Sequence, residues 1–409
     1  MMSRFVKLEH FVIFLAVAAA FIIPMHIGAQ EIFEYQHIRG DQWHLTSVVD
    51  EEVLINGDSL YKTEILNKIS VEVLEGEGQD GLLWNRYGIA EKAVDSSLYA
   101  WSDEYEVEYG RDTRGRLSGI GPESPVPTVR NVPVYLETAV APGDTWFEEG
   151  AEVFNLEPGF GINEILKIRF SAAYVYKGIE FRDGRELSRI LITYSYTWNP
   201  YPDLIKRMAL YDEYPIEISG DFSQEVWWDN KAGRNYAADG NFIYTYFMSS
   251  GDAITFQGQS QGKAYYTEPL DKDALVKEIE DLADDNVSAA ATELGVSVTF
   301  DNIHFAPDKA VMLPGEDVKL KGIEAILRRY PDRDILIVGH TAMIKSGSDG
   351  QLLSEQRAEA VARYFVVNGT RLDTQVVTRG MGHREPVGDN TTEEGRRKNR
   401  RVEIIILEN

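Results

Sequence analysis

Cysteine is absent from this chain of 409 residues, and long apolar runs are almost absent. The lack of cysteine excludes disulfide bonds, thiolate-bound metals and lipid attachment to an N-terminal cysteine. The seven histidines show no paired spacing, and no His-Glu-x-x-His pattern occurs. These absences point away from metal and cofactor chemistry, so we expect no metal site and no cofactor.

One apolar run lies near the N-terminus. Arg4 and Lys7 precede an uninterrupted apolar stretch from Phe11 to Ile23, and small residues follow at Gly28-Ala29. The stretch is shorter than the roughly 20 residues that a helix needs to cross a bilayer. This pattern is typical of a secretory signal. Residues 1–29 are therefore predicted to be a cleaved signal peptide, with an anchoring transmembrane helix as the alternative.

Negative charge is concentrated in one part of the chain. The formal net charge is −25, of which residues 1–29 contribute +1, so the remainder carries −26. Residues 296–409 hold 17 basic and 17 acidic side chains, so the whole excess lies in residues 30–295. Such an acidic surface repels a phosphate backbone. We therefore expect no nucleic-acid partner.

A long stretch after the leader alternates between apolar and polar side chains. One face of Tyr61–Val73 is mostly apolar and the other carries lysine and glutamate, a period typical of a half-buried strand. Trp43–Ile55 reads as another strand and ends at Asn56-Gly57, a strong hairpin signal. Residues 30–268 are therefore predicted to form an antiparallel all-β region, either a barrel or a sandwich, in one domain or two.

The charged face of these strands weighs against an outer-membrane barrel. A lipid-facing strand needs an apolar outer face, and a charge at the bilayer midplane costs about 2–4 kcal/mol. Lys62, Glu64, Lys68 and Glu72 occupy the polar face of the clearest strand. We predict a soluble β-domain, and an integral outer-membrane barrel is the alternative.

Two aromatic pairs in the β-region, Trp227-Trp228 and Tyr265-Tyr266, have two interpretations. They are either sugar-stacking positions or ordinary packing residues, and packing is the commoner role of aromatic side chains in β-domains.

The segment Gly119–Pro133 contains four prolines. Because proline cannot donate to a strand ladder, this segment is expected to be an ordered connection or an edge.

The last part of the chain changes period. Asp271–Leu282 has apolar residues at helical spacing and is predicted to be a short acidic helix in a connector at residues 269–285. Asn286–Phe300 favours either a hairpin at Gly295 or a helix. Residues 286–409 are predicted to form a βαβαβ-type α/β domain with its helices on one face of the sheet. The expected helices are Gly315–Arg329 and Ser354–Asn368, and the expected strands are Val298–Phe305, Ile335–Val338, Gln375–Arg379 and Arg401–Leu407.

Three short motifs lie within this α/β region. They are Gly339-His340-Thr341-Ala342, Leu353-Ser354-Glu355-Gln356-Arg357-Ala358 and Asn399-Arg400-Arg401-Val402-Glu403. In order and spacing they resemble the OmpA/Pal/MotB-type peptidoglycan-binding domain. In the β-region, Pro127–Pro133 and Gly143–Trp146 also resemble segments of exported OmpA-like proteins with all-β N-terminal regions. The resemblance implies a cell-envelope protein that contacts the wall.

The resemblance also implies a ligand site around Arg357. Ser354 is read as a helix N-cap, so that Arg357 would lie in the first turn and form an anion site with the helix N-terminus. In proteins with this domain, the matching arginine holds a carboxylate of the diamino acid in the peptidoglycan stem peptide. Thr341, Asp349 and Phe305 are the other candidate peptidoglycan-binding residues.

Two positions depart from the family pattern. Ala342 stands where the family carries an aspartate that takes the ammonium group of the ligand, and Gly350 replaces an asparagine. Neighbouring Asp349 is a candidate substitute for the lost acid. A charge-assisted hydrogen bond contributes about 1.5–3 kcal/mol. Recognition of the stem peptide is therefore expected to be weakened or altered.

The other motif residues are expected to be structural. Gly339, His340 and Ser354 belong to the strand end and the helix, and Asn399 and Arg400 are expected to brace the last strand against the loop that carries the site. No cysteine nucleophile is present, so we expect a protein that is not an enzyme. A wall hydrolase is the enzymatic alternative, although paired carboxylates are too plentiful here to carry information.

The resulting prediction is an exported structural protein of the periplasm, associated with the outer membrane or the wall. Its expected partners are the stem peptide and, through the β-region, other envelope proteins. The main alternative is an envelope scaffold or protein-interaction module that does not bind peptidoglycan. The alternative role of Arg357 is a structural salt bridge with an acid such as Glu393 or Glu394.

Overall fold

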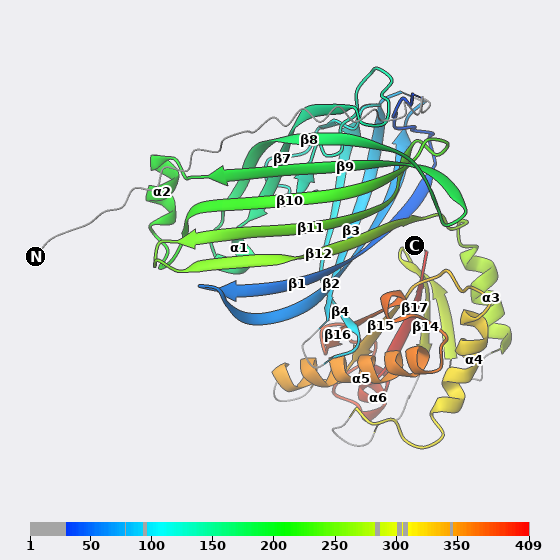
Figure 1. Cartoon of the computed structure of the whole chain (residues 1–409). Coiled ribbons are helices and arrows are strands. Elements are labelled where there is room, and N and C mark those ends of the chain that lie inside the picture. Colours follow the sequence, from blue (N-terminus) through cyan, green and yellow to red (C-terminus); the bar gives the residue numbers. More distant parts are fainter. Residues whose placement is uncertain are drawn as a thin grey trace, which may run out of the picture.

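The computed structural model describes most of the chain beyond the predicted leader. The described residues are 30–77, 79–92, 96–282, 287–300, 305, 310–343 and 347–408. The predicted signal peptide, residues 1–29, lies outside them. Figure 1 shows a large curved sheet from the first two thirds of the chain and a smaller sheet with helices from the last third.

Long antiparallel strands form the larger sheet, which confirms the prediction of an antiparallel all-β region. Neighbours pair in the order β4-β3-β2-β1-β12-β11-β10-β9-β8-β7. Strand β1, the first in the sequence, therefore lies beside β12, the last strand of this sheet in the sequence. The strands are β1 (Gln42–Ile55), β2 (Asp58–Glu75), β3 (Gly81–Lys92), β4 (Tyr99–Arg111), β7 (Thr145–Asn155), β8 (Ile165–Arg182), β9 (Arg185–Trp198), β10 (Pro215–Asp229), β11 (Arg234–Met248) and β12 (Ala253–Tyr265).

The proline-rich segment is an ordered connection, as its composition predicts. It contains only the two-residue strands β5 (Leu117–Ser118) and β6 (Val129–Arg130). The short helices α1 (Glu157–Phe160) and α2 (Pro202–Met208) lie in other connections of the larger sheet.

An aromatic core fills the inner side of the curved sheet. Trp228 is fully buried there, with its ring centroid 4.7 Å from that of Tyr135 and 4.9 Å from that of Tyr35. Trp227 points to the other face, where the guanidinium carbon of Arg182 lies 4.0 Å from its ring centroid. The packing interpretation is therefore correct for this tryptophan pair.

The outer face of the same strands is mostly polar. Tyr194, Phe222 and Tyr244 pack against the aromatic core from β9, β10 and β11. Successive side chains of a strand point to opposite faces. The neighbours of these three residues, which face outward, are Thr193, Ser195, Asp221, Ser223, Ile243 and Thr245. Among the helices of the described residues, none has the length and apolarity needed to cross a membrane.

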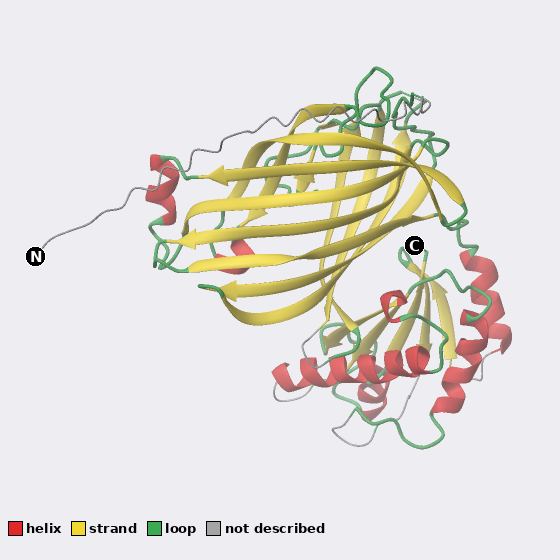
Figure 2. Cartoon of the chain, viewed as in Figure 1, coloured by secondary structure: helices red, strands yellow, loops and turns green. Residues whose placement is uncertain are grey.

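The smaller sheet has the strand order β13-β14-β17-β15-β16, in which β15 and β16 are parallel and the other neighbours antiparallel. The pairing of β13 with β14 confirms the hairpin reading around Gly295. Figure 2 shows the helices gathered around this sheet. The elements are α3 (Lys272–Leu282), β13 (Val287–Ala291), β14 (Gly295–Phe300), α4 (Asp317–Leu327), β15 (Ile335–His340), α5 (Gly347–Val367), the 3₁₀ turn η1 (Asp373–Gln375), β16 (Val376–Gly382), α6 (Glu393–Asn399) and β17 (Val402–Leu407).

Helix α3 belongs to the core of the C-terminal part. Its residues Leu275 and Ile279 are buried in the same cluster as Leu320 of α4 and Phe365 of α5. The sequence predicted the amphipathic helix correctly, but its apolar face is covered by the C-terminal fold. Helix α3 therefore packs as part of the C-terminal fold.

The other face of the smaller sheet packs against the outer face of β2, β3 and β4. Leu66 is fully buried there among Leu336, Val338 and Ile405. The contact continues as a short parallel pairing, in which Val377 of β16 lies opposite Tyr99 of β4. The charged face of β2, which the sequence indicated as a non-core face, is thus partly covered by the C-terminal part.

Candidate functional site

Glycine at the end of β15 allows helix α5 to lie directly on the strand. A Cβ atom on Gly339 would lie 2.1 Å from the carbonyl oxygen of Ser354 and 3.4 Å from the backbone nitrogen of Ala358. On the neighbouring strand, a Cβ on Gly380 would lie 2.4 Å from Cγ of Glu355. These two glycines set the position of the α5 turn that carries Arg357.

Ser354 lies two turns inside α5 and is not the N-cap, so the sequence prediction for the start of this helix is wrong. The helix begins at Gly347. The buried hydroxyl of Ser354 donates to the carbonyl oxygen of Gln351 at 2.7 Å and accepts from the backbone N–H of Gly382 at 2.9 Å. This hydroxyl joins the helix to the end of β16, which is a structural role.

Arg357 is consequently far from the helix N-terminus. Ten residues separate it from Gly347, which is about 15 Å along a helix. The macrodipole acts only within the first turn, so the predicted combination of a helix N-terminus with this guanidinium is also wrong. The charge of Arg357 and its fork of donors do not depend on the helix terminus.

Phe305 and Arg357 lie together, although 52 positions separate them in the sequence. The guanidinium carbon of Arg357 lies 5.0 Å from the ring centroid of Phe305, within the range of a cation–π contact. Stacking on an aromatic ring holds a guanidinium in one orientation. Glu393 forms ion pairs with Arg396 and Arg400, and Glu394 with Lys398. The acids named for the alternative salt bridge thus have other partners.

The residues after β15 run beside the end of β16. The backbone N–H of Thr341 donates to the carbonyl oxygen of Gly382 at 2.7 Å. The hydroxyl of Thr341 is buried and has no hydrogen-bond partner among the described residues. Ala342 is 5% exposed, so a buried methyl group occupies the departed family position. Gly350, the second departed position, is buried in α5, and the side chain of Asp349 lies outside the described part.

Asn399 organises the loop between β16 and α6, which borders Met343. Its buried side-chain oxygen accepts the backbone N–H groups of Val387 and Gly388, both at 2.8 Å. Its amide nitrogen donates to the side-chain oxygen of Asn390 at 2.9 Å, which in turn accepts the N–H of Met343 at 3.2 Å. Asn399 therefore fixes a loop that reaches the residue next to Ala342. Arg400 is more exposed and pairs with Glu393.

His340 is a buried neutral side chain. Burial and the nearby charge of Arg401 lower its pKa to about 3, so the ring is uncharged at neutral pH. Its backbone N–H donates to the carbonyl oxygen of Arg401 at 3.0 Å, and the Arg401 side chain donates to Glu403 at 2.6 Å. Within the residues that the structure describes, no group of three or more metal-ligating side chains comes together.

Strand β12 contains a five-residue pattern centred on Ser260. Residues 258–262 read Gly-Gln-Ser-Gln-Gly, which has the letters of a serine-hydrolase elbow. That elbow needs a sharp turn from a strand into a helix. Here Ser260 lies in mid-strand, paired in register with Val49 and Gly240. The pattern does not form a nucleophile site.

Comparison with known proteins assigns the C-terminal part. Residues 304–400 match the OmpA family. The chain is 38% identical over 110 residues to the peptidoglycan-binding protein ArfA of Mycobacterium tuberculosis, covering 27% of this chain and 33% of that protein. It is 31% identical over 105 residues to the probable lipoprotein YiaD of Escherichia coli, covering 26% and 48%. A solved outer membrane protein of Borrelia burgdorferi is 29% identical with a TM-score of 0.25, covering 30% of this chain and 96% of that one.

These matches identify the class of the C-terminal domain. The C-terminal part of this chain is an OmpA-like domain, as the three motifs predicted. The chain spans less than half the length of the two curated relatives named above. The large curved sheet lies outside the matched residues.

Proposed function

We propose that this protein is an exported, non-catalytic component of the cell envelope whose OmpA-like domain contacts peptidoglycan through Arg357. The stacking of Arg357 on Phe305 is the observation that carries the proposal. It orients a bidentate donor in a domain whose relative ArfA is named for peptidoglycan binding. The group recognised is a carboxylate of the stem peptide, because a guanidinium fork matches a carboxylate.

Recognition in this protein differs from the family pattern at one position. Ala342 offers a buried methyl group where the family has an acid, so the ammonium group of a diamino acid lacks that partner. Losing a charge-assisted hydrogen bond lowers affinity by roughly ten- to a hundredfold. Asp349, in the first turn of α5, is the candidate that would restore part of this loss.

The curved sheet is proposed to lie in the aqueous periplasm and to bind other envelope proteins. The polar outer neighbours of Tyr194, Phe222 and Tyr244 support this location, because a lipid-facing strand needs an apolar outer face. The contact of this sheet with the OmpA-like domain gives the protein a fixed relation between its wall-binding end and its β-region.

Co-sedimentation with purified sacculi tests the proposal on the chain from residue 30 onward. The unaltered protein should pellet with sacculi, and Arg357→Ala should remain in solution. Arg363→Ala is the matched control, because Arg363 lies on the same helix and pairs with Glu359 on its exposed side. This control should pellet like the unaltered protein.

The outcomes separate wall binding from the scaffold alternative. If the unaltered protein does not pellet, or if Arg357→Ala pellets equally well, the site is not used and a scaffold role is favoured. Ala342→Asp adds a positive test, since it should raise stem-peptide affinity roughly ten- to a hundredfold if the family geometry is intact.

A further inference from the structure

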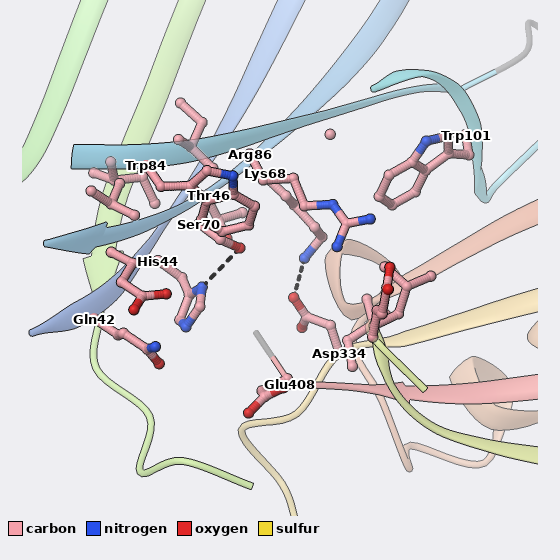
Figure 3. Close-up of a pocket in the computed structure, with 18 residues that line it drawn as sticks. Gln42, His44, Thr46, Lys68, Ser70, Trp84, Arg86, Trp101, Asp334 and Glu408 are labelled. Carbon is pink, nitrogen blue, oxygen red and sulfur yellow. Dashed lines mark hydrogen bonds and ion pairs between the residues drawn. The ribbon is translucent and has the colours of Figure 1, made fainter. Parts of the chain in front are cut away.

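A cavity lies between the curved sheet and the OmpA-like domain, away from Arg357. Its volume is about 280 Å³. Its floor is the outer face of β1, β2 and β3, and its opposite wall comes from the C-terminal part, with Leu294, Asp334, Leu407 and Glu408. Figure 3 shows these lining residues. Ligand sites commonly occur at such junctions between two parts of a chain.

The floor of the cavity is a regular grid of side chains set by strand register. His44 of β1 lies opposite Ser70 of β2, which lies opposite Arg86 of β3. The flanking rows, two residues away along each strand, are Gln42, Glu72 and Trp84 on one side and Thr46, Lys68 and Gly88 on the other. Adjacent strands are about 4.8 Å apart, so nine positions share one small surface.

Aromatic rings border two ends of this grid. Trp84 occupies one end of the β3 row and remains half-buried. At the other end, Gly88 leaves room for Trp101, because a Cβ on Gly88 would lie 2.7 Å from the ring of that tryptophan. Both indoles line the cavity, with the polar grid between them.

Most charges in the cavity are neutralised within the protein. Lys68 pairs with Asp334, Arg86 with Glu104, and Glu408 with Lys272 at 2.5 Å. Nδ1 of His44 lies 3.1 Å from the hydroxyl of Ser70. Burial, with the nearby charges of Arg333 and Lys68, lowers the pKa of His44 to about 4, so this ring is neutral at pH 7. The site therefore offers hydrogen bonds, while its further acids Glu72 and Glu293 disfavour an anionic ligand.

We propose that this cavity binds a neutral sugar ring. The apolar face of a pyranose fits against an indole, and its hydroxyls fit a dense grid of amide, hydroxyl and imidazole groups. Glu72 at the rim accepts hydroxyl hydrogen bonds but repels an anionic sugar. The volume lies near the lower end of small-molecule sites, which limits the bound part to about one ring. This site is separate from the proposed wall contact at Arg357.

Calorimetric titration of the chain from residue 30 onward tests the proposal. The probes are N-acetylglucosamine and its disaccharide, with glucuronate as the anionic counterpart. We expect saturable binding of the neutral probes and weaker binding of glucuronate. Trp84→Ala should weaken neutral-sugar binding roughly tenfold. Gln42→Ala should weaken it several-fold, and its exposed side chain can be removed without harm to the fold.

Two controls make the result specific. Phe181→Ala removes an exposed aromatic side chain at the hairpin of β8 and β9 and should leave sugar binding unchanged. Arg357→Ala should also leave it unchanged, which separates this site from the wall contact. The proposal is overturned if no neutral probe binds, if glucuronate binds at least as tightly, or if Trp84→Ala and Gln42→Ala bind like the unaltered protein.

Discussion

Substituting Gly339 by alanine tests how the OmpA-like domain positions its arginine. The new Cβ would lie 2.1 Å from the carbonyl oxygen of Ser354. Neither atom belongs to a flexible side chain, because one is fixed to β15 and the other to the backbone of α5. The helix must therefore move away from the strand by about 1 Å to restore an ordinary van der Waals distance.

The expected cost follows from this overlap. Overpacking a well-filled core typically destabilises a protein by about 1–3 kcal/mol, and two rigid backbones place Gly339→Ala near the upper end. The helix also carries Arg357 on its next turn. A shift of about 1 Å weakens a site that depends on placement, so binding to sacculi should fall together with stability.

Urea unfolding and sacculus co-sedimentation measure the two effects. Gly322→Ala is the matched control, because Gly322 lies within α4 and a Cβ there would meet nothing within 4 Å. That variant should gain about 0.5–1 kcal/mol, since alanine is the better helix former, and should bind sacculi normally. If Gly339→Ala unfolds and pellets like the unaltered protein, the close packing of α5 on β15 does not position Arg357.

Three further predictions concern the interface, the bordering loop and a buried acid. Leu66→Ala should lower the free energy of unfolding in urea by about 2–4 kcal/mol, because Leu66 is fully buried between the two sheets. Leu60→Ala, on an exposed part of the same strand, is the control and should lower it little. Equal losses in the two variants would contradict the interface. Asn399→Ala should lower the free energy of unfolding by about 2–3 kcal/mol, because it leaves the N–H groups of Val387 and Gly388 in the bordering loop without acceptors. Asn368→Ala, at the exposed end of α5, is its control. Equal urea midpoints for the two variants would argue against the bracing role of Asn399. Burial raises the pKa of Glu152 to about 7 from the usual 4.5. The stability that this carboxyl group contributes is therefore present below about pH 4.5 and is lost as the pH rises through 7. Glu152→Gln should be more stable than the unaltered protein at pH 8, by up to about 3 kcal/mol, and no more stable at pH 4. Parallel melting-temperature curves from pH 4 to 8 would refute the last prediction.

Local patterns predicted the elements of the fold well. The alternation in Tyr61–Val73 lies within β2, and the turn signal at Asn56-Gly57 joins β1 to β2. The alternation could not show which part of the protein packs against each face of the strand. Leu66 interrupts the charged face of β2, and this one apolar residue among charges was the signal that the face is partly covered.

The candidate site was harder to predict because tertiary contacts override local signals. Ser354 has the chemistry of an N-cap, but its hydroxyl is used by Gly382, a residue 28 positions away. Gly347 and Gly350 resemble helix breakers, yet α5 begins at the first and includes the second. The neighbourhood of Phe305 and Arg357 depends on such distant contacts, and here the family resemblance, rather than local pattern, named both residues.

A double-mutant cycle on stem-peptide binding tests the central claim most directly. The two changes are Arg357→Ala in the protein and amidation of the diamino-acid carboxylate in the peptide. If the guanidinium holds that carboxylate, each change alone should weaken binding about as much as both together, with a coupling of about 1.5–3 kcal/mol. Fully additive effects, or an unaltered protein that does not bind the peptide, would contradict the claim.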